Sequence, residues 1–138
     1  MEPRLGIYIH IPFCASKCGY CDFYSCAGAA DRMADYQHAL LEHIEESAGR
    51  IAPAYIDTVY FGGGTPSYLG AERLCRLLET VFAHYRVDKN AEITTEANPD
   101  SAREVSALRQ LREAGFNRIS LGMQSASDDE LRLIGRVH

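Results

Sequence analysis

Strand-like and helix-like segments alternate four times along the 138-residue chain, and this alternation limits the fold more than any other feature. The strand-like runs are 5–11, 56–61, 91–97 and 117–123. After each run, apolar residues recur at the spacing of one helix face. Strands separated by helices of this length predict right-handed crossovers and a parallel sheet. We therefore expect an α/β fold with parallel strands and outer helices.

Two helix starts carry a capping-box pattern. Ser101 is followed three residues later by Glu104, and Ser127 by Glu130, so we expect these serines to cap the third and fourth helices. Gly115 is expected to end the third helix, because glycine readily adopts the left-handed conformation of a C-terminal cap.

The number of predicted strands indicates whether the chain forms a whole domain or part of a longer one. A closed eight-stranded barrel takes about 250 residues, whereas this chain carries four βα units in residues 1–138, with no internal linker or repeat. Either the domain is a small open sheet, or the chain is the first part of a longer domain. We expect the second.

Composition excludes several classes of protein. A net charge of −5 and a pI of about 5.5 argue against a nucleic-acid-binding surface, which needs a basic patch. No apolar run reaches the roughly 18 residues that a transmembrane helix needs. The first residues do not resemble a secretory signal peptide. The sequence thus predicts a cytoplasmic protein.

Three of the five cysteines, Cys14, Cys18 and Cys21, lie within eight residues after the first strand. In a reducing compartment such a cluster indicates metal or redox chemistry rather than disulfides. A four-iron cluster with one iron left without a protein thiolate fits three cysteines. A zinc site completed by His10 or Cys26, a redox pair and coincidence remain open alternatives.

Further polar or flexible residues follow the other strands. Gly62, Gly63 and Gly64 follow the second strand, Glu96 ends the third, and Gln124 follows the fourth. Ligands of parallel sheets bind beyond the carboxyl ends of the strands, so one cleft could collect these residues. The glycines permit positive φ and a close approach of main chain to a ligand, although an ordinary tight turn would also use glycine.

Less specific interpretations apply to several residues taken alone. Glu96 could be a structural carboxylate paired with Arg118 or Arg103. Gln124 and Arg136 could be solvated surface residues. The remaining candidates are expected to be structural: His10 bonded to backbone at a strand end, Cys75 packed in the core, and Cys26 a free thiol.

Four ordered motifs, "IYIHIPFCASKCGYCDFYS", "VYFGGGTPSYL", "TTEANPDS" and "GFNRISLGMQSASDDELRLIGRVH", extend the pattern over nearly the whole chain. Together they resemble the radical S-adenosylmethionine (SAM) superfamily. Within it they are most similar to the branch that contains the oxygen-independent coproporphyrinogen III dehydrogenase HemN and the heme chaperone HemW. The resemblance implies a partial (β/α)6 barrel of which this chain supplies about the first four βα units.

The resemblance also implies cofactors and roles. Cys14, Cys18 and Cys21 would bind a 4Fe-4S cluster, and SAM would chelate the iron that lacks a thiolate. The positions that match SAM contacts are Tyr8, Tyr20, Gly63, Gly64, Thr65, Glu96, Gln124 and Arg136. With a low-potential electron donor, the implied reaction is reductive cleavage of SAM to a 5′-deoxyadenosyl radical, which abstracts hydrogen from a substrate.

One position separates members of this branch. In the dehydrogenase a fourth cysteine follows two residues after the third, whereas this chain has Phe23 there. The motif is therefore more similar to the chaperone side, which implies heme or another tetrapyrrole as a partner. A true dehydrogenase or a related methyltransferase remains the alternative, because these proteins diverge mainly outside the residues present here.

Overall fold

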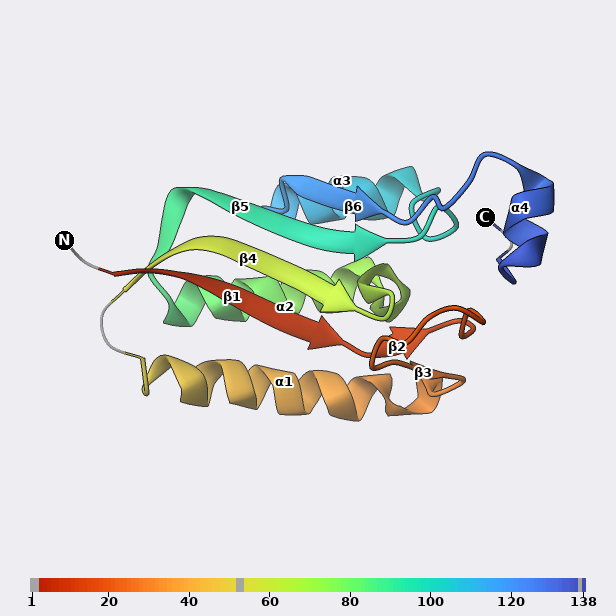
Figure 1. Cartoon of the computed structure of the whole chain (residues 1–138). Helices are drawn as coiled ribbons and strands as arrows, with labels where there is room; N and C mark the ends of the chain where they lie inside the picture. The colour runs from red at the N-terminus through yellow and green to blue at the C-terminus, as the bar shows by residue number, and fades with distance from the viewer. Residues whose placement is uncertain (1–2, 52–53, 137) are drawn as a thin grey trace.

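The computed structural model describes residues 3–51, 54–136 and 138, and it contains one four-stranded parallel sheet (Figure 1). The strands are β1 (Arg4–Ile11), β4 (Tyr55–Gly63), β5 (Val87–Ala97) and β6 (Arg118–Leu121), and they pair in that order. All three pairs are parallel, so spatial order follows chain order. This arrangement confirms the predicted α/β fold, because each strand is added beside the previous one as in a barrel wall.

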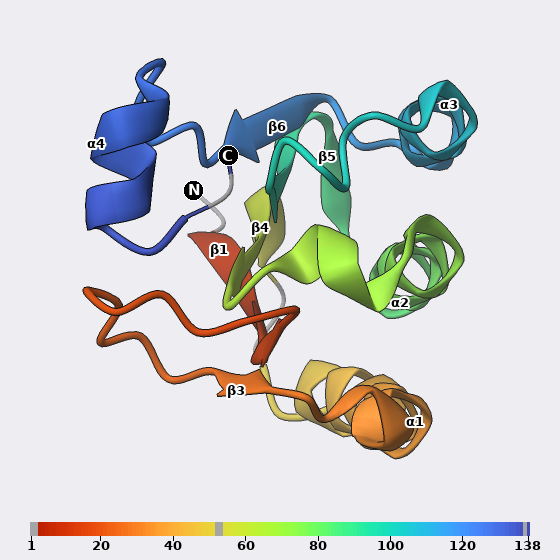
Figure 2. The same cartoon turned by 90° about the vertical axis from the view of Figure 1, so that its right-hand side faces the viewer.

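Three helices cover one face of the sheet, and a fourth lies beyond its end. Helices α1 (Met33–Ala48), α2 (Ala71–His84) and α3 (Val105–Ala114) pack side by side on that face (Figure 2). Helix α4 (Asp128–Leu133) lies beyond the arrowheads of the strands, near the segment that follows β1 (Figure 1). The carboxyl ends of the strands therefore face α4 and the cysteine-containing segment.

The hydrophobic core lies between the sheet and these three helices. Alternate residues of the strands point into it, including Ile11, Val59 and Phe61, which are fully buried. They meet the apolar stripe of α2, of which Leu77 and Leu78 are fully buried. Burial of this apolar area orients each strand, so the intervening strand residues face the opposite side of the sheet.

Four short elements were not expected from the sequence. A two-residue parallel pair, β2 (Phe13–Cys14) with β3 (Cys26–Ala27), closes the base of the cysteine segment, and a bond of 2.7 Å from Cys26 N to Pro12 O supports it. Short 3-10 helices occupy Ala30–Arg32 and Pro66–Leu69. Pairs this short carry no periodic pattern, because their partners are chosen by tertiary contacts.

The helix boundaries correct one prediction and confirm two. Helix α3 begins at Val105 with Glu104 at its N-cap and no side-chain cap, so the capping box predicted at Ser101 is wrong. The Ser101 hydroxyl instead donates to Asn98 O at 2.9 Å and closes the turn after β5. Gly115 ends α3 with a φ of 118°, and the Ser127 side chain caps α4, as predicted.

Within the described part of the chain, none of the helices is both long enough and apolar enough to cross a membrane.

Candidate functional site

A cleft of about 350 Å³ lies at the carboxyl ends of the strands. It is walled by the cysteine segment, by the ends of β4, β5 and β6, and by the segment after α4. The predicted site residues that line it are Cys14, Cys18, Tyr20, Cys21, Gly63, Gly64, Thr65, Glu96, Gln124 and Arg136. Residues that are far apart in the sequence thus meet at one edge of the sheet, where parallel α/β folds bind ligands.

Tyr8 is the predicted site residue that does not line this cleft. Its side chain is exposed on the sheet face opposite the helices, where its hydroxyl bonds to His10 Nδ1 at 2.9 Å. Its ring stacks on Tyr60 with 6.2 Å between centroids. The structure therefore places Tyr8 outside the lining of the cleft, on the sheet face opposite the helices.

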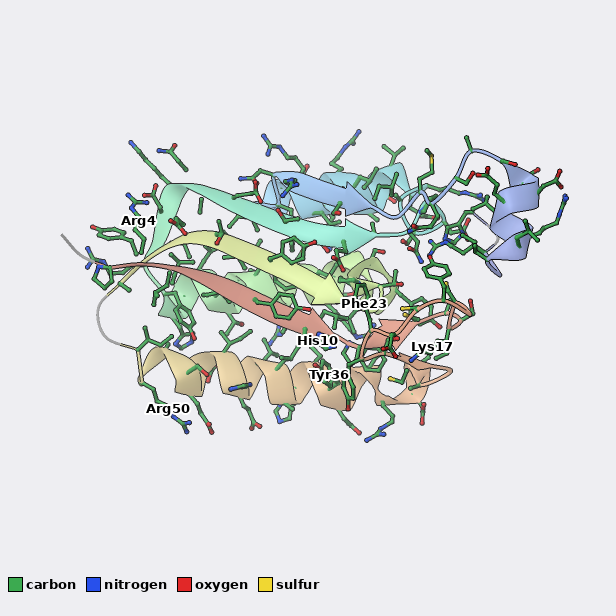
Figure 3. The ribbon with its side chains drawn as sticks, in the orientation of Figure 1. Arg4, His10, Lys17, Phe23, Tyr36 and Arg50 are labelled. Atoms are coloured by element: carbon green, nitrogen blue, oxygen red, sulfur yellow. The ribbon has the colours of Figure 1, made fainter. Side chains whose placement is uncertain are left out.

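The cysteines occupy different environments. Cys14 is buried at the base of the segment, where the Thr65 hydroxyl lies 3.6 Å from its sulfur. Cys18 and Cys21 are half-buried in the turn that follows, which a bond of 3.1 Å from Cys21 N to Cys18 O closes. Figure 3 shows Lys17 and Phe23 in this projecting segment beyond β1, and the Lys17 ammonium reaches Phe23 O at 3.5 Å. All three thiols are free to act as ligands.

The thiols fit a polynuclear cluster better than a single ion. Among the described residues, no three His, Cys, Asp or Glu side chains converge as a single metal ion would require. The proposed fourth zinc ligands are engaged elsewhere: His10 Nε2 bonds to Tyr24 O at 2.9 Å, and the Cys26 thiol faces Pro12 O at 3.4 Å. In a four-iron cluster each thiolate binds a different iron, so the sulfurs need not meet at one point. This donor set favours the cluster over zinc.

The glycines at the end of β4 are required by the packing of the chain itself. Gly63 has a φ of 122°, and a Cβ there would lie 2.7 Å from the His10 ring. Gly64 has no positive φ, but a Cβ there would lie 2.8 Å from Phe13 O and 2.9 Å from Cys14 Sγ. The absence of side chains at these glycines allows the end of β4 to pack directly against the cysteine segment. The glycines are therefore required for this contact and not only for a turn.

Glu96 is held by neighbouring strand residues and not by an arginine. Tyr60 donates to Glu96 Oε1 at 2.7 Å, and Gly63 N donates to Glu96 Oε2 at 3.1 Å. The predicted alternative, an ion pair of Glu96 with Arg118 or Arg103, is wrong. Arg118 pairs with Glu92 at 2.9 Å, and Arg103 pairs with Asp100 at 3.0 Å. One partner on each oxygen orients the carboxylate at the cleft while leaving lone pairs for a ligand.

The hydrogen bond to Glu96, followed by burial, raises the pKa of Tyr60 above its ordinary value of 10.0. We expect Glu96→Gln to lower this pKa toward 10.0, because the amide removes the negative charge. Tyrosinate difference absorbance during an alkaline titration measures it. Because the folded-state pKa is raised, the stability that Tyr60 contributes is present below pH 10 and is lost as the pH rises through the folded-state pKa. An unchanged titration in Glu96→Gln would contradict the assigned contact.

Sequence reasoning missed Asn98 as a site residue. The side-chain Nδ2 of Asn98 donates to Thr65 Oγ1 at 3.3 Å, and its side-chain Oδ1 accepts from Arg136 Nη2 at 3.2 Å. Asn98 precedes Pro99 and is not among the residues that match SAM contacts. Its position two residues after Glu96, just past the end of β5, is the signal that the sequence offers.

A parallel sheet whose strand ends collect three thiols, a carboxylate and close-packed glycines defines the class of protein. Residues 8–138 match the Radical SAM superfamily, and the chain belongs to this superfamily. The expected resemblance to the HemN/HemW branch is confirmed by individual relatives.

Those relatives include heme chaperones. The chain is 43% identical over 136 residues to the heme chaperone HemW of Mycobacterium tuberculosis, covering 96% of this chain and 35% of the relative. It is 40% identical over 137 residues to HemW of Escherichia coli, covering 99% and 36%. The solved structure of coproporphyrinogen III oxidase (HemN) from Escherichia coli, described as a radical SAM enzyme, superposes with a TM-score of 0.90 at 31% identity, over 99% of this chain and 31% of that one. The chain spans about a third of the length of these relatives.

Proposed function

We propose that the chain holds a 4Fe-4S cluster through Cys14, Cys18 and Cys21 and binds SAM in the same cleft. The observation that carries the proposal is the convergence of these thiols with Glu96 and the glycine run on one 350 Å³ cleft. When bound, the cluster would supply an electron from a low-potential donor and an iron with an open position for SAM.

The protein groups would bind and orient the second ligand. Glu96, fixed by Tyr60 and Gly63, presents a carboxylate that can accept hydrogen bonds from the amino or hydroxyl groups of SAM. Gln124 adds an amide that can donate and accept. Thr65, held by Asn98, keeps its hydroxyl against Cys14 and closes the cleft floor around the buried thiol.

We further propose that the biological role is that of a HemW-like heme chaperone and not of a coproporphyrinogen dehydrogenase. The HemW chaperones of Mycobacterium tuberculosis and Escherichia coli are 43% and 40% identical to the chain, whereas the HemN structure is 31% identical. Phe23 at the position of the dehydrogenase's fourth cysteine supports the same assignment. The SAM domain would comprise residues 1–138 as its first four βα units.

The test is made under anaerobic conditions on the natural full-length gene product. After cluster reconstitution we expect SAM to give a saturable calorimetric signal that disappears when the cluster is removed. Heme titration should give a saturable absorbance change, and coproporphyrinogen III with SAM and a reductant should give no decarboxylated product. Turnover of coproporphyrinogen III would assign the dehydrogenase role instead. Absence of SAM binding to cluster-loaded protein would contradict the proposed cleft.

A further inference from the structure

Arg136 uses every donor of its guanidinium within the chain. Nε donates to His138 O at 3.0 Å. Nη1 donates to Cys18 Sγ at 3.6 Å and to Tyr20 Oη at 3.2 Å. Nη2 donates to Asn98 Oδ1 at 3.2 Å and to Gly122 O at 3.0 Å. A guanidinium has five N–H donors, so these five contacts leave no donor for a ligand.

The partners of Arg136 lie on opposite walls of the cleft. Cys18 and Tyr20 belong to the projecting cysteine segment, whereas Asn98 and Gly122 follow β5 and β6. The planar fork directs one nitrogen to each wall, which a lysine ammonium could not do at the same time. Arg136 therefore bridges the segment to the sheet.

The tip of the cysteine segment, residues 16–21, is where Arg136 makes contact with this segment. The base of the segment is paired through β2 and β3, and the Cys14 end is held by a bond of 2.7 Å from Thr65 N to Phe13 O. Within the tip, Cys21 N donates to Cys18 O at 3.1 Å, and a Cβ on Gly19 would meet nothing within 4 Å. In the described part of the chain, the hydrogen bonds from Arg136 are those that join the tip to the strand ends.

We propose that Arg136 is a positioning residue that clasps the tip of the cysteine segment to the ends of β5 and β6 and so holds Cys18 at the cleft before any cofactor binds. The inference rests on the proposed function, because Cys18 is assigned there as a cluster ligand. It differs from the SAM contact that the sequence resemblance implies. A ligand anion reaching this guanidinium would have to replace one of its present acceptors, which would loosen the clasp.

Hydrogen–deuterium exchange of the chain without iron and SAM tests the clasp separately from cofactor binding. Arg136→Gln should accelerate exchange in peptides covering residues 15–22 by about tenfold, because charge-assisted bonds are lost from a locally ordered segment. Arg136→Lys should behave similarly, because the charge remains and the fork does not. Exchange in peptides of β4 should stay unchanged, which shows that the sheet remains folded.

A partner variant and a matched control complete the design. Asn98→Ala should accelerate exchange in the same peptides by a smaller factor, and combining it with Arg136→Gln should add little, because both act through one contact. Arg132→Gln is the control, since Arg132 lies on α4 and its exposed guanidinium pairs with Asp129 at 2.7 Å. Unchanged exchange at residues 15–22 in Arg136→Gln would overturn the clasp. A clasped segment that takes up no iron would instead overturn the proposed function and leave the clasp standing.

Discussion

Alanine at Cys14, Cys18 or Cys21 is expected to abolish iron–sulfur binding, whereas alanine at Cys26 or Cys75 should leave it intact. The wild-type chain, reconstituted without oxygen, should bind about four irons and an equal amount of sulfide. Each of the three thiols lines the cleft, and two remaining thiolates cannot hold a cubane in place of three. Iron and sulfide assays with the visible absorption spectrum of each variant measure the outcome.

The two controls separate loss of a ligand from loss of any thiol. Cys26 is exposed with its sulfur directed to Pro12 O, and Cys75 is buried on α2 with its sulfur 3.7 Å from Gln110 O. Cys75→Ala opens a small core cavity and should lower stability modestly, without loss of iron. Protein that contained stoichiometric zinc and bound no iron on reconstitution would contradict the cluster assignment.

Gly64→Ala is expected to lower both stability and cluster binding. The added Cβ would lie 2.8 Å from Phe13 O and 2.9 Å from Cys14 Sγ. Phe13 O is a main-chain atom, so the clash cannot be relieved by rotating a flexible side chain. A bond of 2.8 Å from Gly64 N to Ile11 O holds the two segments together, so the clash must displace Cys14. We expect a loss of about 1–3 kcal/mol in the free energy of unfolding, as for other overpacked sites.

Chemical denaturation of the apo chain and iron content after reconstitution test this prediction. Gly19→Ala serves as the matched control, because a Cβ there would meet nothing within 4 Å and Gly19 has no positive φ. The control should keep wild-type stability and iron content. If Gly64→Ala also kept both, the close approach of β4 to the cysteine segment would be wrong.

The packing around Gly63 and Gly64 in the structure refines an expectation drawn from the sequence. The sequence indicates that the glycine run leaves space for a ligand to approach the main chain. In the structure, the space at Gly64 is occupied by Phe13 and Cys14, and positive φ is confined to Gly63 within the run. A sequence shows that side chains are absent at a position, but which atoms use the space depends on how distant segments pack.

Local patterns were sufficient for the order and type of the main elements. Each strand-like run overlaps one strand of the sheet, and a helix follows each of these strands along the chain. These features follow from side-chain periodicity and from glycine at Gly115, which act within a few residues. Spacing alone also singled out Cys14, Cys18 and Cys21, because ligands contributed by one loop lie close in sequence.

The contacts that complete the site were decided by tertiary structure. The Ser101 hydroxyl could either cap α3 or close the turn after β5. It bonds to Asn98 O in that turn, and α3 has no side-chain cap. Glu96 had arginines available in the sequence, but parallel pairing placed Tyr60 beside it instead. Arg136 likewise reaches Cys18 from 118 positions away along the chain. Hydrogen-bond partners of this kind are chosen by which strand ends meet at the cleft, and no local pattern encodes that choice.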